Sequence, residues 1–296
     1  MTNPDQLKKI ATGAGFFAAL DQSGGSTPQA LELYGIGRQS YSGDGEMFDL
    51  VHQMRTRIIA SPSFDGDMVL GTILFEQTMD RSIDGVPSAQ YLWQRKQVVP
   101  FLKIDQGLAP TADGVRCMKP IRGLEALLGR AAAEGIFGTK MRSLIQLADQ
   151  SAIAALLDQQ FDYARQVLKA GLVPIIEPEV DIASPVKVEA ETLLLPGIIA
   201  RLEELSPSDQ VMLKLSLPSL AGYYGELTRH PRVLRVLALS GGYSRAEANR
   251  LLAANPGMIA SFSRALLEGL RAQQSDAEFN RILDRSITSI YAASMA

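Results

Sequence analysis

Eight short apolar runs recur along this chain of 296 residues, and each is followed by a turn. The runs are almost continuously hydrophobic, whereas a strand with one face in water alternates apolar and polar residues. A continuous run indicates a strand that is buried on both faces, as in a parallel sheet covered by helices. The runs occupy residues 16–20, 69–75, 98–104, 137–141, 173–176, 211–217, 233–239 and 258–262.

Helical spacing marks the segments between several of these runs. In residues 149–170 apolar side chains recur every three or four positions, and Gly171 ends the pattern. Similar patterns occupy residues 125–134, 189–205, 244–254 and 276–293. Eight strand–helix units in about 250 residues are typical of a closed (β/α)8 barrel, whereas an open doubly wound sheet usually has fewer strands. The sequence therefore predicts an α/β fold, with a single TIM-barrel domain over residues 1–296.

Charge and composition exclude several classes of protein. The 29 Lys and Arg residues nearly balance the 32 Asp and Glu residues, so no basic surface for a nucleic acid is expected. No segment reaches the roughly 18 apolar residues that span a bilayer, and the amino-terminal segment lacks the apolar core of a signal peptide. A lone cysteine, Cys117, cannot form an internal disulfide, which favours a reducing compartment. We therefore expect a cytoplasmic protein without nucleic-acid or membrane partners.

Charged residues gather near the ends of the predicted strands, where barrel enzymes place their reactive groups. Residues two apart on a strand share a face, so these charges fall on one side as pairs, and their apolar neighbours face the helices. The pairs are Lys103 with Asp105, Lys140 with Arg142, and Glu177 with Glu179. The alternative for each charge alone is a solvated strand tip or a structural ion pair. Lys214 interrupts an apolar run in its middle, which predicts a lysine inside the barrel.

A buried lysine among other cations suits nucleophilic chemistry. Burial and like-charge repulsion both favour the neutral amine, which is the form that attacks a carbonyl carbon. His52 and His230 are the only histidines, so a zinc site with three histidine ligands is impossible, and we expect no metal and no cofactor. Carbonyl chemistry would then run through a Schiff base on Lys214, with a carboxylate such as Glu177 as the acid and base.

The ends of the last two predicted strands carry an anion-binding pattern. Ser240, Gly241 and Gly242 follow the seventh strand, and Ser244 is the predicted N-cap of the next helix. Glycines let backbone N–H groups approach an oxyanion, and the helix dipole favours a phosphate. A Ser-Gly-Gly run alone is more often just a turn. Arg264, which follows the eighth strand, offers a guanidinium to the same place and strengthens the prediction of a phosphate site.

These residues together resemble the class I fructose-1,6-bisphosphate aldolases, and specifically the short bacterial type. The resemblance extends over nearly the whole chain. The runs that carry it include Ala19-Leu20-Asp21-Gln22-Ser23-Gly24-Gly25-Ser26, Lys103-Ile104-Asp105, Gly138-Thr139-Lys140-Met141-Arg142, Ile176-Glu177-Pro178-Glu179, Leu213-Lys214, Ser240-Gly241-Gly242 and Ser263-Arg264. It implies a metal-independent lyase of glycolysis and gluconeogenesis. Such an enzyme reversibly cleaves fructose-1,6-bisphosphate to dihydroxyacetone phosphate and glyceraldehyde-3-phosphate.

The resemblance also implies a catalytic role for five residues. Lys214 matches the lysine that forms the Schiff base with the C2 carbonyl. Glu177 matches the general acid and base, and Glu179 matches its partner. Asp21 matches the carboxylate that handles the substrate hydroxyl during C3–C4 cleavage, and Lys140 matches the lysine beside the nucleophile. Whether Asp21 or Glu177 takes the proton of the C4 hydroxyl stays open at this point.

The remaining matches concern the two phosphates of the substrate. Near the distal phosphate, the resemblance places Lys103 and Arg142, together with the serines Ser23 and Ser26. The C1-phosphate site is matched by Ser240, Gly241, Gly242 and Arg264. We therefore expect a sugar bisphosphate and triose phosphates as ligands, and a homo-oligomer is compatible with the sequence. Two alternatives are a Schiff-base lyase for another sugar phosphate and a non-catalytic barrel that binds sugar phosphates.

Overall fold

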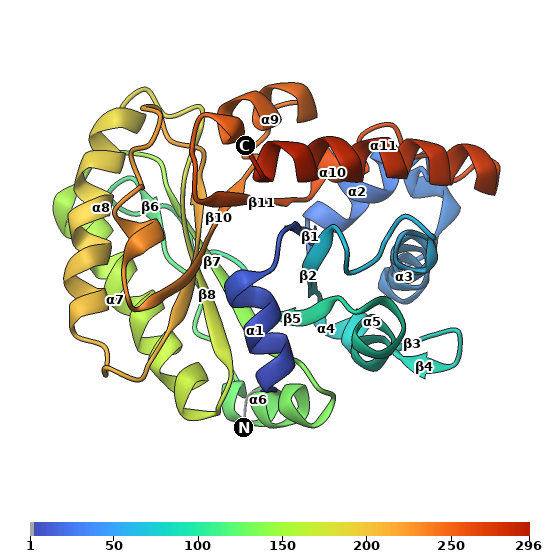
Figure 1. The fold of residues 1–296 in the computed structure, drawn as a ribbon, viewed down its shortest axis with the longest axis horizontal. Coiled ribbons are helices and arrows are strands. Elements are labelled where there is room, and N and C mark those ends of the chain that lie inside the picture. Colours follow the sequence, from blue (N-terminus) through green and yellow to red (C-terminus); the bar gives the residue numbers. More distant parts are fainter. Residues whose placement is uncertain (1–2) are drawn as a thin grey trace.

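The computed structural model describes residues 3–296, and eight parallel strands in it close into a barrel (Figure 1). Around the ring the strands follow the order β1, β2, β5, β7, β8, β9, β10 and β11, and β11 pairs back onto β1. The predicted (β/α)8 barrel is therefore confirmed. The strands are β1 (Phe16–Leu20), β2 (Val69–Leu74), β5 (Val99–Lys103), β7 (Gly138–Ile145), β8 (Val173–Val180), β9 (Val211–Ser216), β10 (Val233–Leu239) and β11 (Met258–Phe262).

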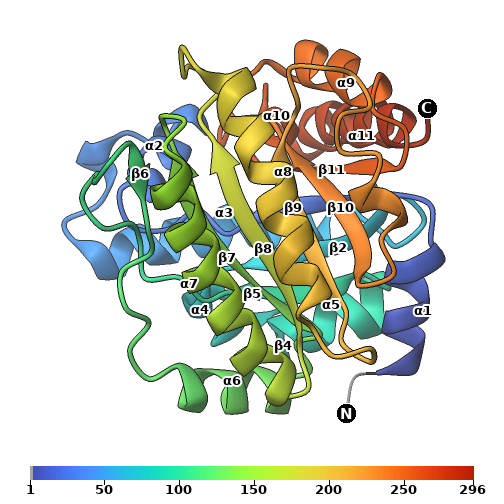
Figure 2. The ribbon, with the colours of Figure 1, turned by 90° about the vertical axis from the view of Figure 1, so that its left-hand side faces the viewer.

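Helices lie around the outside of the barrel (Figures 1 and 2). The five predicted helical segments all form helices, but one expected strand–helix unit does not. Between β9 and β10 the described chain forms only the short 3-10 helix η2 (Leu227–Arg229). The outer helices are α2 (Ser26–Leu33), α3 (Asp44–Ala60), α4 (Glu76–Met79), α5 (Ser88–Lys96), α6 (Leu124–Ala133), α7 (Gln150–Lys169), α8 (Lys187–Glu203), α9 (Arg245–Ala253), α10 (Arg264–Leu267) and α11 (Asp276–Ser294). Short elements complete the chain: η1 (Arg38–Ser40), β3 (Ser82–Ile83), β4 (Val86–Pro87) and β6 (Val115–Arg116).

Helix α7 shows how the local sequence sets these elements. The Asp149 side chain caps the helix by accepting a hydrogen bond of 2.8 Å from the backbone N–H of Ala152. A buried stripe along the helix begins at Ile153 and continues at Leu156 and Leu157. This stripe packs onto the barrel and leaves the polar face of the helix in water.

Two hydrophobic clusters stabilise the barrel from its two sides. The outer cluster lies between the strands and the helices, and it contains the four residues predicted to face the helices, Ile104, Ile176, Leu213 and Leu215. The inner cluster fills the barrel near the amino ends of the strands. Its centre is a row of aromatic rings in edge-to-face contact, Phe17 with Phe101 at 5.2 Å and Phe101 with Phe137 at 5.4 Å.

Helix α1 (Pro4–Thr12) closes the amino-terminal end of the barrel. Ile10 packs with the inner cluster, and Arg235 on β10 donates hydrogen bonds of 2.7 Å to the carbonyls of Ile10 and Gly13. Since apolar side chains and α1 fill this end, the open end is the one at which the strands terminate. Barrel enzymes have their active sites at that end.

Strands β7 and β8 are longer than the sequence predicted. Their apolar runs end at residues 141 and 176, but pairing continues to Ile145 and Val180. Part of the reason is β6, which adds to β7 as an antiparallel edge strand and pairs with Leu144 and Ile145. Arg142 and Glu177 therefore lie within strands rather than in loops, and they pair with each other between β7 and β8.

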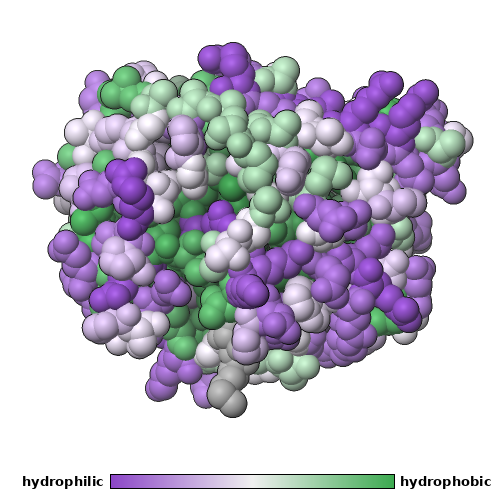
Figure 3. All heavy atoms as spheres, in the orientation of Figure 1, coloured by the Kyte–Doolittle hydropathy of each residue, from purple (hydrophilic) through white to green (hydrophobic). Residues whose placement is uncertain are grey.

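Hydrophilic residues cover most of the face of the molecule seen in Figure 3. Hydrophobic residues gather in a hollow near the centre of this face, in the region where Figure 1 labels β7, β8 and β10. Leu234 on β10 is one of the partly buried hydrophobic residues that pack against the inner cluster.

Among residues 3–296, no helix combines the length and the hydropathy that crossing a membrane requires.

Gly138 lets β5, β7 and β8 approach one another closely. An added Cβ would lie 2.2 Å from the backbone oxygen of Val173 and 2.7 Å from the ring of Phe101. We expect Gly138→Ala to lower the free energy of unfolding by about 1–3 kcal/mol, because the backbone of β8 must shift. Gly129→Ala in α6 is the control, since its Cβ meets no atom within 4 Å and alanine favours a helix. Equal stability of the two variants in urea denaturation would contradict this account.

Candidate active site

The ends of the barrel strands surround a cavity of about 860 Å³. All thirteen residues singled out from the sequence as site residues line this cavity. They are Asp21, Ser23, Ser26, Lys103, Lys140, Arg142, Glu177, Glu179, Lys214, Ser240, Gly241, Gly242 and Arg264. Seven strands or the segments after them contribute these residues, so the barrel brings together groups that are far apart in the sequence.

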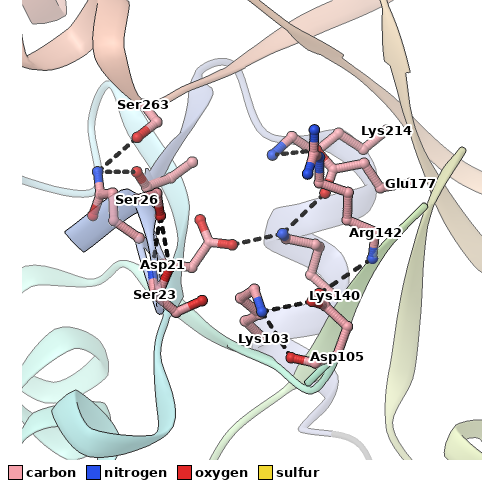
Figure 4. Close-up of polar contacts among 12 residues, drawn as sticks. Asp21, Ser23, Ser26, Lys103, Asp105, Lys140, Arg142, Glu177, Lys214 and Ser263 are labelled. Carbon is pink, nitrogen blue, oxygen red and sulfur yellow. Dashed lines mark hydrogen bonds and ion pairs between the residues drawn. The ribbon is translucent and has the colours of Figure 1, made fainter. Parts of the chain in front are cut away.

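A chain of buried charges crosses the floor of the cavity (Figure 4). Lys140 Nζ on β7 lies 2.6 Å from Asp21 Oδ2 and 3.0 Å from Glu177 Oε2. Lys214 Nζ on β9 lies 3.0 Å from the other carboxylate oxygen, Glu177 Oε1. Each of these four side chains is less than a tenth exposed. Glu177 therefore bridges the two lysines, and Asp21 contacts Lys140 from the opposite side.

The mutual charges of this cluster outweigh the effect of burial. Burial alone raises the pKa of the Asp21 carboxyl, but the charges of Lys140 and Lys214 hold that pKa below its usual value. Burial also raises the pKa of the Glu177 carboxyl, but the charges of the same two lysines lower it by more, so that this pKa lies below its usual value. Burial likewise lowers the pKa of Lys140, yet Asp21 and Glu177 raise it above its usual value. Lys140 thus carries a fixed positive charge, and a neutral amine is not favoured at this lysine.

Acid pH should weaken the contribution of this cluster to stability. The folded-state pKa of Asp21 lies below its usual 3.8, so its contribution is complete well above pH 3.8 and is lost as the pH falls toward the folded-state value. Between pH 6 and pH 3 we expect the free energy of unfolding to fall by roughly 1 kcal/mol more in the unsubstituted protein than in Asp21→Asn. Urea titrations at each pH measure this difference. Parallel pH dependences of the two proteins would contradict the ion pair of Asp21 with Lys140.

Two further ion pairs lie on the side of the cavity formed by β5 and β7. Lys103 Nζ lies 2.6 Å from Asp105 Oδ1 and also donates a hydrogen bond to the backbone oxygen of Asp105. Arg142 Nε pairs with Glu179, and its backbone N–H donates to Asp105 Oδ2 at 3.2 Å. Burial lowers the pKa of Arg142, but the hydrogen bond and charge of Glu179 raise it above the usual value. Both cations are therefore already held by carboxylates, as the ion-pair alternative anticipated for Arg142 and Asp105.

The opposite side of the cavity contains the predicted anion-binding turn. Gly241 and Gly242 have φ angles of +60° and +126°, which residues with a Cβ rarely adopt. A Cβ on Gly242 would lie 3.5 Å from a terminal nitrogen of Arg264, so the guanidinium stands beside the turn. Arg264 is exposed and forms no ion pair within the described chain. Ser244 caps α9 by accepting from Glu247 N, which confirms the predicted N-cap.

Arg55 on α3 is a charged residue of this region that the sequence analysis missed. It is fully buried, and it donates hydrogen bonds of 2.5 Å to the carbonyl of Gln22 and 2.7 Å to Thr78 Oγ1. Gln22 in turn donates to Ser263 Oγ at 2.6 Å, so the network joins the loops that carry Asp21 and Arg264. Burial lowers the pKa of Arg55 to about 10, against the opposing charge of Asp21. An arginine within the apolar stripe of a helix was the signal available in the sequence.

Comparison with known proteins gives the same family from independent evidence. A family model described as class-I fructose-bisphosphate aldolase matches residues 10–200. Fructose-bisphosphate aldolase class 1 of Synechocystis sp. is 59% identical over 293 residues, which cover 99% of this chain and 98% of that protein. The proteins of the same name from Porphyromonas gingivalis and Clostridium acetobutylicum are 50% and 53% identical, each over 99% of both chains.

A solved structure has the same fold at a lower sequence identity. The fructose-bisphosphate aldolase of Plasmodium falciparum, crystallised with TRAP and a small-molecule inhibitor, superposes with a TM-score of 0.77. The match covers 98% of this chain and 92% of that one at 20% identity, so it supports the fold alone. The family model and the full-length relatives decide the family. This chain belongs to the class I fructose-bisphosphate aldolases.

Proposed function

We propose that this protein cleaves fructose-1,6-bisphosphate reversibly to dihydroxyacetone phosphate and glyceraldehyde-3-phosphate, through a Schiff base on Lys214 and without a metal. The position of Lys214 carries the proposal. Its amine lies in the floor of a polar cavity, in contact with the buried carboxylate of Glu177, and not in solvent. Family membership supports the same reaction and substrate.

Formation of the Schiff base requires a proton to move between Lys214 and the substrate oxygen. Glu177 Oε1, 3.0 Å from Lys214 Nζ, can accept a proton from the ammonium and so free the amine for attack on C2. The attack gives a carbinolamine, in which a proton passes from the nitrogen to the former carbonyl oxygen. Glu177 then returns its proton to this C2 hydroxyl, which leaves as water. The product is an iminium, whose positive nitrogen can accept an electron pair.

Cleavage of the C3–C4 bond requires a base for the C4 hydroxyl, and we assign this role to Asp21. Asp21 lies beyond Lys140 from Glu177, which suits a substrate that extends from C2 at Lys214 along the chain of charges. Its lowered pKa keeps it ionised at neutral pH, ready to accept the proton. The electron pair of the broken bond moves to the iminium, and glyceraldehyde-3-phosphate leaves. Protonation of the resulting enamine at C3 and hydrolysis release dihydroxyacetone phosphate and restore Lys214.

The two phosphates would bind at two separate places in the cavity. The turn at Ser240 and Gly242, with the exposed Arg264 beside it, suits the C1 phosphate near Lys214. Ser23 and Ser26, which line the same cavity, are our candidates for contacts with the distal phosphate. The fixed charge of Lys140 lies between the two ends and would stabilise negative charge on the reacting oxygens.

A steady-state assay tests the reaction. The purified protein should release equal amounts of the two triose phosphates from fructose-1,6-bisphosphate. EDTA at about 10 mM, a large excess over any bound metal, should leave the rate of cleavage unchanged. A class of aldolase that depends on a metal serves as the positive control for the chelator. Turnover that EDTA abolishes, or no cleavage of this substrate, would contradict the proposal.

We also propose that residues 1–296 act as one domain in the cytoplasm. Strands from residue 16 to residue 262 share one barrel, and α11 packs back onto the same outer cluster, which supports one domain. Cys117 is a free thiol, as suits a reducing compartment. A homo-oligomer stays a prediction, to be checked by light scattering of the purified protein.

A further inference from the structure

We propose that Arg116 on β6 binds the distal phosphate of the substrate and so makes the enzyme select ketose bisphosphates. Arg116 was not among the residues singled out from the sequence, and it lies outside the chain of charges that includes Lys214. The inference rests on the proposed function, since it names a contact for one end of the same substrate. Three features of the structure carry it: the strand register, the pairing of the neighbouring cations, and the order of strands around the barrel.

The strand register places Arg116 on the inner face of the sheet. Arg116 pairs with Leu144 on β7, and Leu144 pairs with Glu179 on β8. Residues paired across neighbouring strands project to the same face, and Glu179 projects into the cavity. Arg116 accordingly lines the same cavity and is half-buried. Figure 2 shows β6 level with the arrowhead of β8, at the end where the strands terminate.

Arg116 is the cation on this side of the cavity that no carboxylate holds. Lys103 pairs with Asp105, and Arg142 pairs with Glu179. Arg116 forms no ion pair with residues 3–296, and its Nε donates one hydrogen bond of 3.0 Å to the carbonyl of Ala109. Both terminal nitrogens therefore keep their N–H groups free. A guanidinium fixed at Nε and open at its terminal nitrogens suits a bidentate contact with phosphate oxygens.

The order of strands places Arg116 across the mouth from Arg264. In a ring of eight strands, the gap between β10 and β11 lies opposite the gap between β5 and β7. Arg264 follows β11, whereas Arg116 lies on the strand that extends β7. Two guanidinium groups without carboxylate partners thus face each other across one cavity. This arrangement matches a ligand with a phosphate at each end, in which the phosphate nearer the ketone lies with Arg264.

The segment around Arg116 holds this side chain in place. Strand β6 lies within a hairpin of residues 107–119, which is joined by backbone hydrogen bonds of 2.9 Å from Ala109 N to the carbonyl of Cys117 and from Lys119 N to the carbonyl of Gly107. Ala109 is also the residue whose carbonyl accepts from Arg116 Nε, so the hairpin sets the direction of the guanidinium. Lys119 on the same hairpin is exposed and does not line the cavity, which makes it a matched control.

Two measurements on Arg116→Gln test the proposal. The first is kcat/KM for cleavage of fructose-1,6-bisphosphate, which should fall by roughly 10- to 100-fold, mainly through a higher KM, because a charge-assisted contact is lost. The second is the concentration of dihydroxyacetone phosphate that gives half-maximal trapping by borohydride. This ligand carries the near phosphate alone, so that concentration should change less than about twofold. Arg116→Lys keeps the charge and should give an intermediate loss in kcat/KM.

Lys119→Gln should match the unsubstituted enzyme in both measurements. A loss of less than about threefold with fructose-1,6-bisphosphate would overturn the proposal, since a charge-assisted contact to the phosphate should exceed that. The proposal would also be overturned if both Arg116 variants bound dihydroxyacetone phosphate more weakly by the same factor as they lose kcat/KM for fructose-1,6-bisphosphate. Arg116 would then act on the whole site and not on the distal phosphate. The proposed function itself would fail differently, as absence of borohydride trapping in the unsubstituted enzyme.

Discussion

Lys214→Arg should lower kcat for cleavage of fructose-1,6-bisphosphate by about 10⁴-fold or more, a loss typical of removing a covalent nucleophile. Arginine keeps a positive charge beside Glu177, so the carboxylate does not become an isolated buried charge. A guanidinium stays protonated at neutral pH, however, and cannot form an iminium with C2. The loss therefore isolates the nucleophile from the electrostatics of the site.

A matched lysine on the surface provides the control for this variant. Lys169 in the last turn of α7 is exposed, and Lys169→Arg makes the same chemical change outside the cavity. This control should retain full activity. Residual turnover of Lys214→Arg above about one hundredth of the unsubstituted rate would show that another group can attack C2, and the account would then be wrong.

Glu177→Gln should damage both catalysis and stability. The amide cannot exchange protons with Lys214 Nζ or with the leaving hydroxyl, so kcat should fall by about 10²- to 10⁴-fold. The change also removes the carboxylate that lies between Lys140 and Lys214, and leaves Asp21 as the remaining contact of Lys140. Breaking a buried ion pair on one side typically costs about 3–5 kcal/mol, so the free energy of unfolding should fall measurably.

The two effects of Glu177→Gln can be separated. Folded enzyme, checked by urea denaturation, should still form the borohydride adduct with dihydroxyacetone phosphate, but at a much lower rate, because Lys214 remains. Glu203→Gln at the exposed end of α8 serves as the control and should alter neither property. Unchanged kcat together with unchanged stability would remove Glu177 from the proposed mechanism.

The barrel and the positions of its main charges could be predicted from the sequence because both depend on local patterns. Continuous apolar runs gave all eight strands of the barrel, and alternation along those strands placed Leu213 and Leu215 outside and Lys214 inside. The chemistry at Lys214 was visible because a lysine within an apolar run conflicts with its surroundings. Such conflicts concentrate at functional sites.

Features that depend on pairing between distant segments could not be predicted. The far end of β7, up to Ile145, pairs with β6, whose residues Val115 and Arg116 form too short a run to indicate a strand. For the same reason nothing local showed that Arg116 lies in the cavity. Arg55 was missed because its partners, Gln22 and Thr78, come from other strand ends. The state of Lys140 also depends on carboxylates from β1 and β8, which only the closed barrel brings together.

The most direct test of the central claim is mass spectrometry of the enzyme after borohydride reduction in the presence of dihydroxyacetone phosphate. The account predicts one covalent adduct per chain, on the peptide that contains Lys214, with the same yield when EDTA is present. Lys214→Arg should give no adduct. Labelling of Lys140 or Lys103 in place of Lys214, or no labelling of the unsubstituted enzyme, would contradict the account.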